Sequence, residues 1–406
     1  MADFKVELVT IGIEEHPNAD ALELAAVGGY RAIVKKGQHR DGATVAYIPE
    51  SALLPEWLLK QENFWDAGKG KGMLAGSRGD RVKPIKLRGV LSEGLVIKPQ
   101  MTDGDDPSRV VFARFKPEYI EDPEGFKAKI SEDYDEECRI DHWEDSVIVT
   151  PDSDPSVLMN FFGIQKYEPP IPVHMAGEVM NKHGWSIHYD IENWKKFPEA
   201  LEDGEEVVMT EKIHGTNVQI GYVPEKDWVI IASKGLGAKG LVFKLNERNE
   251  SNLYVRIATG GEYSLVDKVK RMAEKLGQPV YLMGEIFGRG VQDLMYQQNE
   301  PTFRAFDMYV GRPQQGNYVN WDTFVQNCTL LKIPMVPLLY RGPFDKEVMI
   351  EHTNGKEAVS DGGSNIREGI VVKPPVERQD STLGRVVLKS VSEAYLTRKG
   401  NTTELQ

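Results

Sequence analysis

Short stretches in which apolar and polar residues alternate dominate the first 100 residues. Each stretch is bounded by Gly, Asp or Pro, and the clearest are FKVELVTIGIEE, LELAAVGGYRAIVKKG, ATVAYIP and VKPIKLRGVLSEGLVIK. A period of two residues predicts half-buried strands, and several short strands joined by glycine turns predict a small barrel. We therefore expect a β-barrel domain over residues 1–100, with LLPEWLLK as a short helix within it.

The pattern changes over residues 101–165. The stretches TDGDDPS, EDPEGF and SEDYDEECRIDHWEDS are acidic and poor in aliphatic residues. Such a composition is typical of an insertion or connector, and it fits partial helix and disorder equally. The proline cluster in VLMNFFGIQKYEPPIP marks the boundary after it.

From residue 166 to residue 406, segments with a strand period mix with segments that have a helical period. Strands are predicted for EEVVMTEKIHG, NVQIGYV, DWVIIASKG, PVYLMGEIFG, FRAFDMYVG, REGIVVKP and GRVVLKSVS. Two helices are predicted, in WDTFVQNCTLLK and in EYSLVDKVKRMAEKLG, where Gly277 is a typical stop after Leu265, Val269, Met272 and Leu276. The fold class is α+β, with antiparallel sheets and helices in this second domain.

Composition and charge narrow the class of protein. A chain of 406 residues is long enough for two domains. The net charge of −13 argues against a surface coated in basic residues, although a local basic strip or a divalent metal can still bind nucleic acid. Cys138 and Cys328 lie far apart, which disfavours a disulfide scaffold or a thiolate zinc site. Without an apolar signal core or a run of 18 apolar residues, we expect a cytoplasmic protein with no membrane partner. We separately expect a monomer.

Charged residues inside strand-like segments are the candidates for chemistry. A lone lysine such as Lys212 in EKIHGTN is ordinarily solvated, but burial and nearby cations make a lysine a nucleophile. Glu285 in GEIFG and Glu368 in REGIVVKP are carboxylates that need partners or a metal. Two carboxylates suit Mg²⁺ and a ribose, and lysines such as Lys373 and Lys389 suit a triphosphate. Singly, each also fits a turn or a snorkelling side chain.

Taken in order, these motifs resemble those of the covalent nucleotidyltransferase superfamily of ligases and capping enzymes. EKIHGTN resembles the nucleophile motif, and ASKG, GEIFG, FRAFD, REGIVVKP and LKSVS resemble the motifs that follow it. The common pattern is Lys-x-Asp-Gly, and His214 stands in place of the Asp, as in nick-sealing RNA ligases. The resemblance covers residues 166–406 and implies an adenylyltransferase domain of the ligase type.

The N-terminal segment resembles OB modules of two kinds. HPNADALELAAVGGYRAIVKKGQHRDGATVAYIPESALLP, followed by KLRGVLSEGL, is similar to the N-terminal OB domain of the Deinococcus and Naegleria type of RNA ligase. HPNADALEL also resembles the tRNA-binding OB module of some aminoacyl-tRNA synthetases. Both imply an OB-like RNA-binding domain over residues 1–100. A candidate phosphate strip, which a solvated loop explains equally, comprises Lys69, Lys71, Arg78, Arg81, Lys83, Lys86 and Arg88.

The resemblance implies ATP-dependent ligation of nicked duplex RNA or an RNA/DNA hybrid. Lys212 attacks the α-phosphate of ATP, AMP then passes to an RNA 5′-phosphate, and an RNA 3′-OH finally expels AMP. Lys389, Lys373 and Mg²⁺ or Mn²⁺ supply the positive field for the first step. His214 resembles the residue that relatives need in the later steps, as a phosphate donor or with a turn-stabilising role.

The remaining roles also follow from the resemblance. Glu285 holds the ribose hydroxyls, and both Glu285 and Glu368 are candidate metal ligands, Glu368 through water. Phe306 stacks on adenine, and Asp307 assists the metal or a phosphate during sealing. Lys234 reaches the nucleotide or the incoming 5′-phosphate.

Two departures from the family pattern keep alternatives open. Relatives often have two lysines in Lys-x-Lys order in the last motif, whereas here Lys389 is alone and is flanked two places away by Val387 and Val391. In addition, Lys234 stands where many relatives have Arg. A catalytically inactive RNA- or tRNA-binding protein is therefore one alternative. A capping-type guanylyltransferase is another, although such enzymes and DNA ligases usually carry an OB domain after the transferase domain. NAD-dependent ligases need a nicotinamide domain and a cysteine zinc cluster, and neither is visible.

Overall fold

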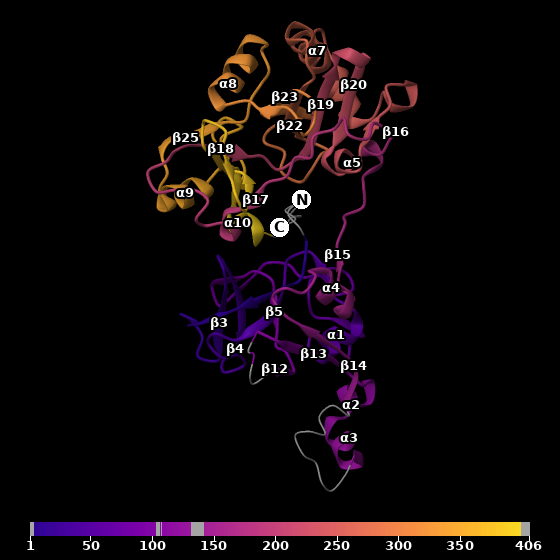
Figure 1. Cartoon of the computed structure of the whole chain (residues 1–406), viewed down its shortest axis with the longest axis vertical. Helices are drawn as coiled ribbons and strands as arrows, with labels where there is room; N and C mark the ends of the chain where they lie inside the picture. Colours follow the sequence, from indigo (N-terminus) through magenta and orange to yellow (C-terminus); the bar gives the residue numbers. More distant parts are fainter. Residues whose placement is uncertain (1–3, 103–105, 107, 131–141, 399–406) are drawn as a thin grey trace. The chain divides into compact units, whose positions relative to one another are not determined.

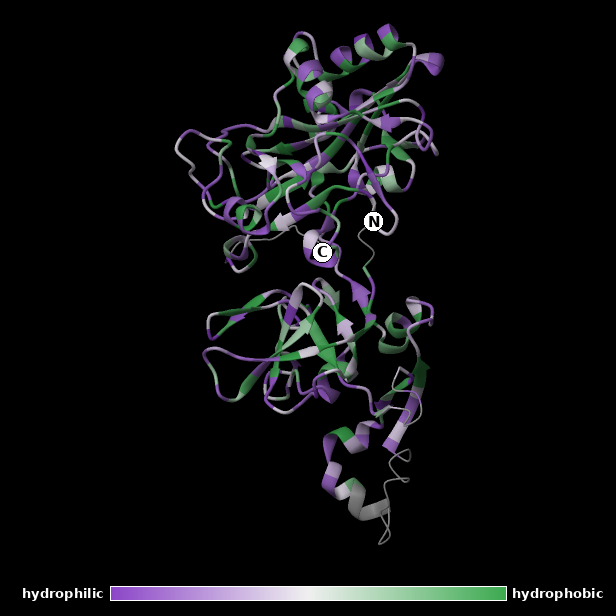
Figure 2. Cartoon of the chain, turned by 60° about the vertical axis from the view of Figure 1, so that its left-hand side comes forward, coloured by the Kyte–Doolittle hydropathy of each residue, from purple (hydrophilic) through white to green (hydrophobic). Residues whose placement is uncertain are grey.

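The computed structural model divides the chain into two compact units (Figure 1), which meet in sequence between residues 169 and 170. The structure describes residues 4–102, 106, 108–130 and 142–398. Figure 2 shows hydrophobic segments along the strands of both units. Each unit therefore has its own apolar interior, and each is described separately.

Antiparallel strands build the N-terminal unit, as the alternating pattern predicts. One sheet has the order β1-β5-β11, and another has the order β2-β3-β4. The cores of this unit include Ile48, Leu58, Ile97 and, in a second cluster, Ala25 and Val45. The elements over the first 100 residues are β1 (Glu7–Thr10), β2 (Gly12–Glu15), β3 (Leu22–Val27), β4 (Tyr30–Lys35), β5 (Thr44–Ile48), β6 (Ala52–Leu53), α1 (Glu56–Gln61), β7 (Trp65–Asp66), β8 (Lys71–Gly72), β9 (Ile85–Leu87), β10 (Val90–Ser92) and β11 (Leu95–Ile97).

Residues 101–165 differ from the expected connector. Val110, Phe112 and Val149 on two paired strands, with Leu158 and Phe162 on a helix, join the core of the N-terminal unit. Among the acidic residues of this segment lies a strand, β13, with buried residues at alternate positions such as Val110 and Phe112. The elements are β12 (Met101–Thr102), β13 (Val110–Phe115), α2 (Pro117–Glu121), α3 (Pro123–Ile130), β14 (Trp143–Val149), α4 (Ser156–Phe162) and β15 (Gln165–Lys166). Much of the acidic stretch SEDYDEECRID, including Cys138, lies outside the described residues.

Two five-stranded sheets form the framework of the C-terminal unit. We call them the β18 sheet, of order β17-β29-β26-β18-β25, and the β22 sheet, of order β20-β19-β22-β23-β24. Their strands are β17 (Glu192–Asn193), β18 (Glu206–Lys212), β19 (Thr216–Val223), β20 (Trp228–Ser233), β22 (Val280–Phe287), β23 (Thr302–Val310), β24 (Asn317–Tyr318), β25 (Leu338–Pro343), β26 (Gly369–Lys373) and β29 (Leu388–Val391). The small pairs β16 (Val179–Asn181) with β21 (Leu241–Phe243) and β27 (Gln379–Asp380) with β28 (Gly384–Arg385) complete the strands of this unit.

Helices cover the outside of these sheets. The helix predicted to stop at Gly277 is α7, which begins with a capping box between Ser264 and Asp267 and ends at Gly277 with φ of 64°. It buries Val269 and Ala273 in the core that the β22 sheet forms. With α7 (Leu265–Leu276), the α-helices of this unit are α5 (Lys234–Ala238), α6 (Leu253–Thr259), α8 (Trp321–Leu330), α9 (Lys346–Thr353) and α10 (Glu393–Leu396).

Strand register decides which side chains share a face of the β18 sheet. Lys212 pairs with Gly369, Val208 pairs with Lys373, and Val371 pairs with Lys389. Directly paired residues and residues two apart point to the same side of a sheet. The lysines at 212, 373 and 389 therefore share one face. The opposite face carries the apolar residues Val207, Met209, Ile370, Val372 and Leu388, together with the buried Glu211, which pairs with Ile370.

Gly369 leaves no room for a side chain between β26 and β29. A Cβ atom at this position would lie 2.1 Å from the Ser390 carbonyl oxygen. We expect Gly369→Ala to lower the free energy of unfolding by about 1–3 kcal/mol, because the backbone must shift to relieve the overlap. Gly235→Ala in α5 is the control, since a Cβ there meets nothing within 4 Å. Helix propensity should make the control neutral or more stable. Urea unfolding of both variants checks this, and equal stabilities would contradict it.

Candidate active site

A buried ion pair between Lys212 and Glu368 lies where β18 ends. Lys212 is the last residue of β18, and its Nζ donates a hydrogen bond to Glu368 Oε1 at 2.6 Å. The Lys212 side chain is 18% exposed and the Glu368 side chain 1% exposed. A carboxylate buried so deeply needs a cationic or hydrogen-bonding partner, and Lys212 is one. The pair holds the Lys212 amine in place at the end of β18, within hydrogen-bond distance of a carboxylate.

The turn after Lys212 brings the β18 sheet against β22. Gly215 allows this approach, because a Cβ there would lie 2.2 Å from the Ile286 carbonyl oxygen and 3.0 Å from Glu285 Cγ. Glu285 itself pairs with Asn217 on β19 and is half-buried. The EKIHGTN and GEIFG motifs therefore meet in space.

β23 has a bulge at the FRAFD motif, next to Phe306 and Asp307. Met283 pairs with Asp307, whereas Gly284 pairs with Ala305, so Phe306 is an extra residue on β23. A bulge of this kind redirects neighbouring side chains. The Phe306 ring lies 5.1 Å from the Tyr189 ring, centroid to centroid, and Phe306 packs beside Met283 and Tyr309.

Asp307 ties the two sheets together through buried cations. Its Oδ1 accepts a hydrogen bond from Lys373 Nζ at 3.2 Å, and its Oδ2 lies 2.7 Å from an Arg385 guanidinium nitrogen. Arg385 also forms two hydrogen bonds with Glu377, both 2.6 Å, and lies 3.6 Å from the Tyr318 ring centroid. Burial raises the pKa of Asp307, but Lys373 and Arg385 outweigh it and hold that pKa below its usual value.

The two other predicted lysines differ in their surroundings. Lys389 is 5% exposed and lies beside Val371 on the face that carries Lys212. Lys234 begins α5 and is half-exposed, with its Nζ 2.6 Å from Asp190 Oδ1. Lys389 thus belongs to the buried charged face, whereas Lys234 is half-exposed at the start of α5 and pairs with Asp190.

His214, two residues after Lys212 in the chain, is fully buried. Its Nε2 lies 2.7 Å from Asp293 Oδ1, and its Nδ1 lies 2.9 Å from the Tyr395 hydroxyl. Burial lowers the pKa of His214 to about 4, helped by Arg398 and Lys212 and opposed by Asp293. Both ring nitrogens therefore have protein partners here, and the imidazole is neutral at pH 7.

The sequence analysis missed several residues that contact the predicted ones. Arg385 stands two and four residues before Val387 and Lys389, so a charged residue at an alternate position of this strand was a usable signal. Asp293, Tyr395 and Arg398 gave no such signal, because each lies in a loop or short helix far along the chain from His214.

The described residues contain no group of three or more His, Cys, Asp or Glu side chains that could hold a metal ion. Glu368 and Glu285 are thus not part of an all-protein metal cage in that portion of the chain. Mg²⁺ commonly uses one or two carboxylates together with substrate phosphates and water instead. The deeply buried Glu368 carboxylate beside Lys212 fits this kind of incomplete donor set.

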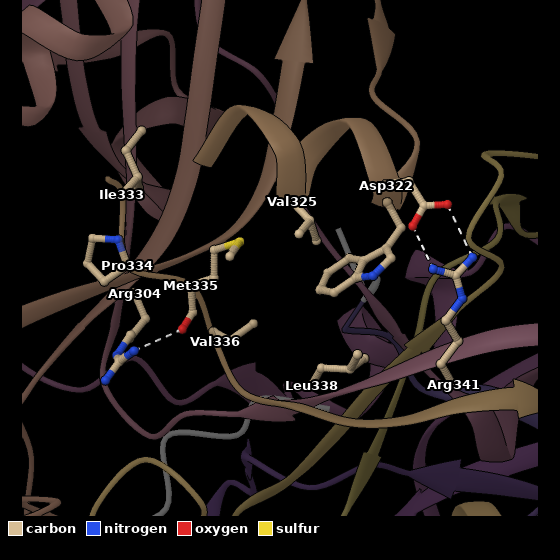
Figure 3. A pocket seen from close by; sticks show the side chains of 10 residues that line it. Arg304, Asp322, Val325, Ile333, Pro334, Met335, Val336, Leu338 and Arg341 are labelled. Carbon is tan, nitrogen blue, oxygen red and sulfur yellow. Dashed lines mark hydrogen bonds and ion pairs between the residues drawn. The ribbon is translucent and has the colours of Figure 1, made fainter. Parts of the chain in front are cut away.

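A cavity of about 450 Å³ lies elsewhere in the C-terminal unit (Figure 3), and none of the predicted site residues lines it. Val325, Met335 and Leu338 give it an apolar lining. Its two arginines are engaged at its rim: Arg304 donates to the Met335 carbonyl, and Arg341 pairs with Asp322. The chemistry of the motifs therefore belongs to the charged sheet face and not to this cavity.

The candidate phosphate strip of the N-terminal unit is partly neutralised. Lys69 pairs with Asp66, and Arg78 pairs with Asp80, each at 2.7 Å. The Arg81 guanidinium lies over the Tyr167 ring. Lys86 and Arg88 belong to the exposed β9–β10 hairpin, which makes this hairpin the more open part of the strip.

Two segments of the chain match models of known protein families. Residues 205–391 match a family model described as RNA ligase, and residues 6–99 match one described as an OB-fold domain. The chain thus combines a segment similar to the RNA ligase family with an N-terminal segment similar to an OB-fold domain, which confirms the expected fold class.

Solved structures of the Naegleria gruberi RNA ligase share the fold over nearly the whole chain. The structure with PPi is 20% identical with a TM-score of 0.66, covering 97% of this chain and 98% of that one. A mutant with AMP and Mn has 20% identity, a TM-score of 0.67 and the same coverage. A mutant with ATP and Mn has 19% identity and a TM-score of 0.66, covering 96% and 98%. No curated protein matches the chain in sequence.

Among the residues that the structure describes, no helix has the length and apolar character needed to cross a membrane.

The buried neutral imidazole should make stability depend on pH. The unfolded chain binds a proton at this histidine below about pH 6.5, whereas folded His214 does so only near pH 4. The free energy of unfolding should therefore fall as pH decreases through this window, by about 2 kcal/mol at pH 5. Urea unfolding at pH 7.5 and pH 5 measures the loss, with His214→Asn as the comparison. Parallel losses in both proteins would contradict the depressed pKa.

Proposed function

We propose that this protein is an ATP-dependent RNA ligase that joins an RNA 3′-OH to a 5′-phosphate through lysyl-AMP and RNA-adenylate intermediates. The observation that carries the proposal is the buried Lys212 amine, 2.6 Å from Glu368, on a sheet face that also holds Lys373 and Lys389. A lysine nucleophile, a proton acceptor and cations for phosphates are the groups that adenylyl transfer requires.

In the first step, Lys212 Nζ attacks the α-phosphorus of ATP. A nitrogen–phosphorus bond forms, the bond from the α-phosphorus to the bridging oxygen breaks, and pyrophosphate leaves. The amine must lose a proton, and Glu368 Oε1 is the carboxylate within hydrogen-bond distance. Lys389 and Lys373 share the face and stabilise the charge that develops on the phosphate oxygens.

The adenosine part of ATP fits the β22 sheet side. Phe306, displaced outward by the bulge, offers a ring for adenine, and Glu285 beside the turn after Lys212 offers a carboxylate for the ribose hydroxyls. The similar Naegleria gruberi structures with ATP or AMP support adenosine over guanosine.

A divalent metal fits Glu368 together with the nucleotide phosphates. When bound, Mg²⁺ or Mn²⁺ supplies Lewis-acid stabilisation of the phosphate charge. Glu285 is the second candidate carboxylate. The chain's own residues then orient the phosphates toward Lys212.

The second step takes place at the α-phosphorus of lysyl-AMP, and the third takes place at the phosphorus of the RNA 5′-phosphate. An oxygen of the RNA 5′-phosphate attacks the α-phosphorus of lysyl-AMP, the nitrogen–phosphorus bond breaks, and Lys212 regains a proton. The 3′-OH then attacks the activated 5′-phosphate, loses its proton, and AMP leaves. Asp307 and Lys234 are proposed to assist phosphate binding in these steps, and His214 is proposed to support them.

We propose nicked duplex RNA or an RNA/DNA hybrid as the substrate, bound with help from the N-terminal OB-fold domain. The exposed hairpin with Lys86 and Arg88 supports a contact with phosphates there. We further propose that the enzyme acts as a monomer in the cytoplasm, where the buried thiol of Cys328 remains reduced.

Incubation with ATP and Mg²⁺ tests the covalent chemistry. Wild-type protein should gain the mass of one AMP, and Lys212→Ala should gain none, because the variant lacks the amine that donates to Glu368 Oε1. Lys275→Ala, an exposed position at the end of α7, should be adenylylated like wild type. Intact-protein mass spectrometry measures the adduct.

The same assay separates the alternative functions. An adduct with GTP but not ATP would indicate a guanylyltransferase. Absence of any adduct with ATP, GTP or NAD would overturn the ligase proposal and favour a catalytically inactive RNA- or tRNA-binding protein, with buried Val387 in the last motif as the first position to examine.

A further inference from the structure

Four residues from two separate segments hold His214. The loop after β22 contributes Asp293, which lies 2.7 Å from Nε2, and Tyr296, whose hydroxyl accepts the His214 backbone N–H at 2.7 Å. The C-terminal segment contributes Tyr395 at Nδ1 and Arg398, whose guanidinium donates to Asp293 Oδ1 at 2.9 Å. The backbone N–H and both ring nitrogens of the histidine in the nucleophile motif therefore have partners.

The partners of the ring specify one tautomer. Asp293 is ionised, since its pKa is below the usual value: burial raises this pKa, but His214 and Arg398 more than offset the effect. An ionised carboxylate only accepts, so Nε2 carries the proton. Nδ1 is then the acceptor for the Tyr395 hydroxyl. The bonds from Tyr395 to Nδ1, from Nε2 to Asp293 and from Arg398 to Asp293 then each have one donor and one acceptor, and the Arg398 nitrogen that donates to Asp293 also lies 3.3 Å from Nε2.

The same segment also holds the acid of the ion pair. The Ser392 backbone N–H donates to the Glu368 carbonyl at 2.8 Å, and α10 begins directly after Ser392. Glu368 Oε2 lies 3.8 Å from His214 Nδ1. Movement of the C-terminal segment would therefore disturb both Glu368, which is the partner of Lys212, and His214, which follows Lys212 by two residues.

The loop after β22 shows backbone strain at this contact. Tyr296 and the next residue, Gln297, have φ values of 51° and 56°, in the left-handed region that side chains other than glycine seldom adopt. Tyr296 is nevertheless fully buried. Such strain persists where surrounding contacts over-determine it, and it clusters at functional sites.

We infer that Asp293, Tyr296, Tyr395 and Arg398 form a brace that positions His214 and Glu368, and through them the Lys212 amine, for attack on phosphorus. The inference rests on the proposed function and adds residues outside the recognised motifs to its machinery. None of the four needs to touch substrate, so they are positioning residues. In the braced state His214 has no ring nitrogen left over for a phosphate, and its role is structural support of the nucleophile.

The brace predicts a selective loss of the adenylylation rate. Tyr395→Phe and Asp293→Asn should each lower the rate constant for lysyl-AMP formation by roughly 10-fold to 100-fold, because small displacements of a reacting group have large effects. The KM for ATP should change little, since the ATP contacts remain. Tyr222→Phe is the matched control: it also removes a buried tyrosine's hydrogen bond to a carboxylate, that of Asp227, and should react at the wild-type rate.

Nitrogen NMR of ¹⁵N-histidine-labelled protein provides a readout other than activity. His214, assigned by its absence in His214→Asn, should show the Nε2-protonated tautomer in wild type. Asp293→Asn should shift it toward the other tautomer, because an amide can donate to Nε2, and Tyr395→Phe should change the Nδ1 shift.

The outcomes separate the two claims. If wild type forms no adduct, the proposed function fails. If wild type forms the adduct while Tyr395→Phe and Asp293→Asn keep both the rate and the His214 tautomer, the brace is wrong. Should Asp293→Asn not fold, Tyr395→Phe, which removes a single oxygen atom, decides alone.

Discussion

The burial of charge on one face of the β18 sheet is the constraint on which the C-terminal unit depends. Lys212, Lys373 and Lys389 share that face by register, while the other face is mainly apolar. Buried charges are costly unless they are paired, and removing one partner of such a pair is strongly destabilising. The carboxylates of Glu368, directly before β26, and of Asp307, on β23 of the other sheet, supply these partners.

Asp307 links the two sheets because it belongs to β23 and its partners belong to other strands. It contacts Lys373 on β26 and Arg385 on β28. The bulge at Phe306 is what turns Asp307 and its neighbour to where they are needed. The bulge in β23, the ion pairs of Asp307 and the Phe306 ring next to Asp307 thus depend on one another. A substrate phosphate on this face would meet cations that are already fixed, with little reorganisation left to occur.

Much of this arrangement was predictable from local pattern, and the rest was not. Charged residues inside otherwise apolar strands marked Lys212, Glu368 and Lys389 without any knowledge of the fold. The strand alternation likewise predicted the sheets. Residues 101–165 were predicted poorly, because acidic composition outweighed the alternation in VVFARF, which forms β13. Asp293 and Tyr395 lie 79 and 181 residues from His214, and only the tertiary fold brings such distant positions together.

A crystal structure with a non-hydrolysable ATP analogue and Mg²⁺ tests the central claim most directly, because the C-terminal unit offers two distinct places for a nucleotide. The account predicts adenine on Phe306, the α-phosphorus in line with Lys212 Nζ, and the phosphates beside Lys373 and Lys389. A nucleotide in the apolar cavity next to α8, or one whose phosphates point away from Lys212, would contradict it.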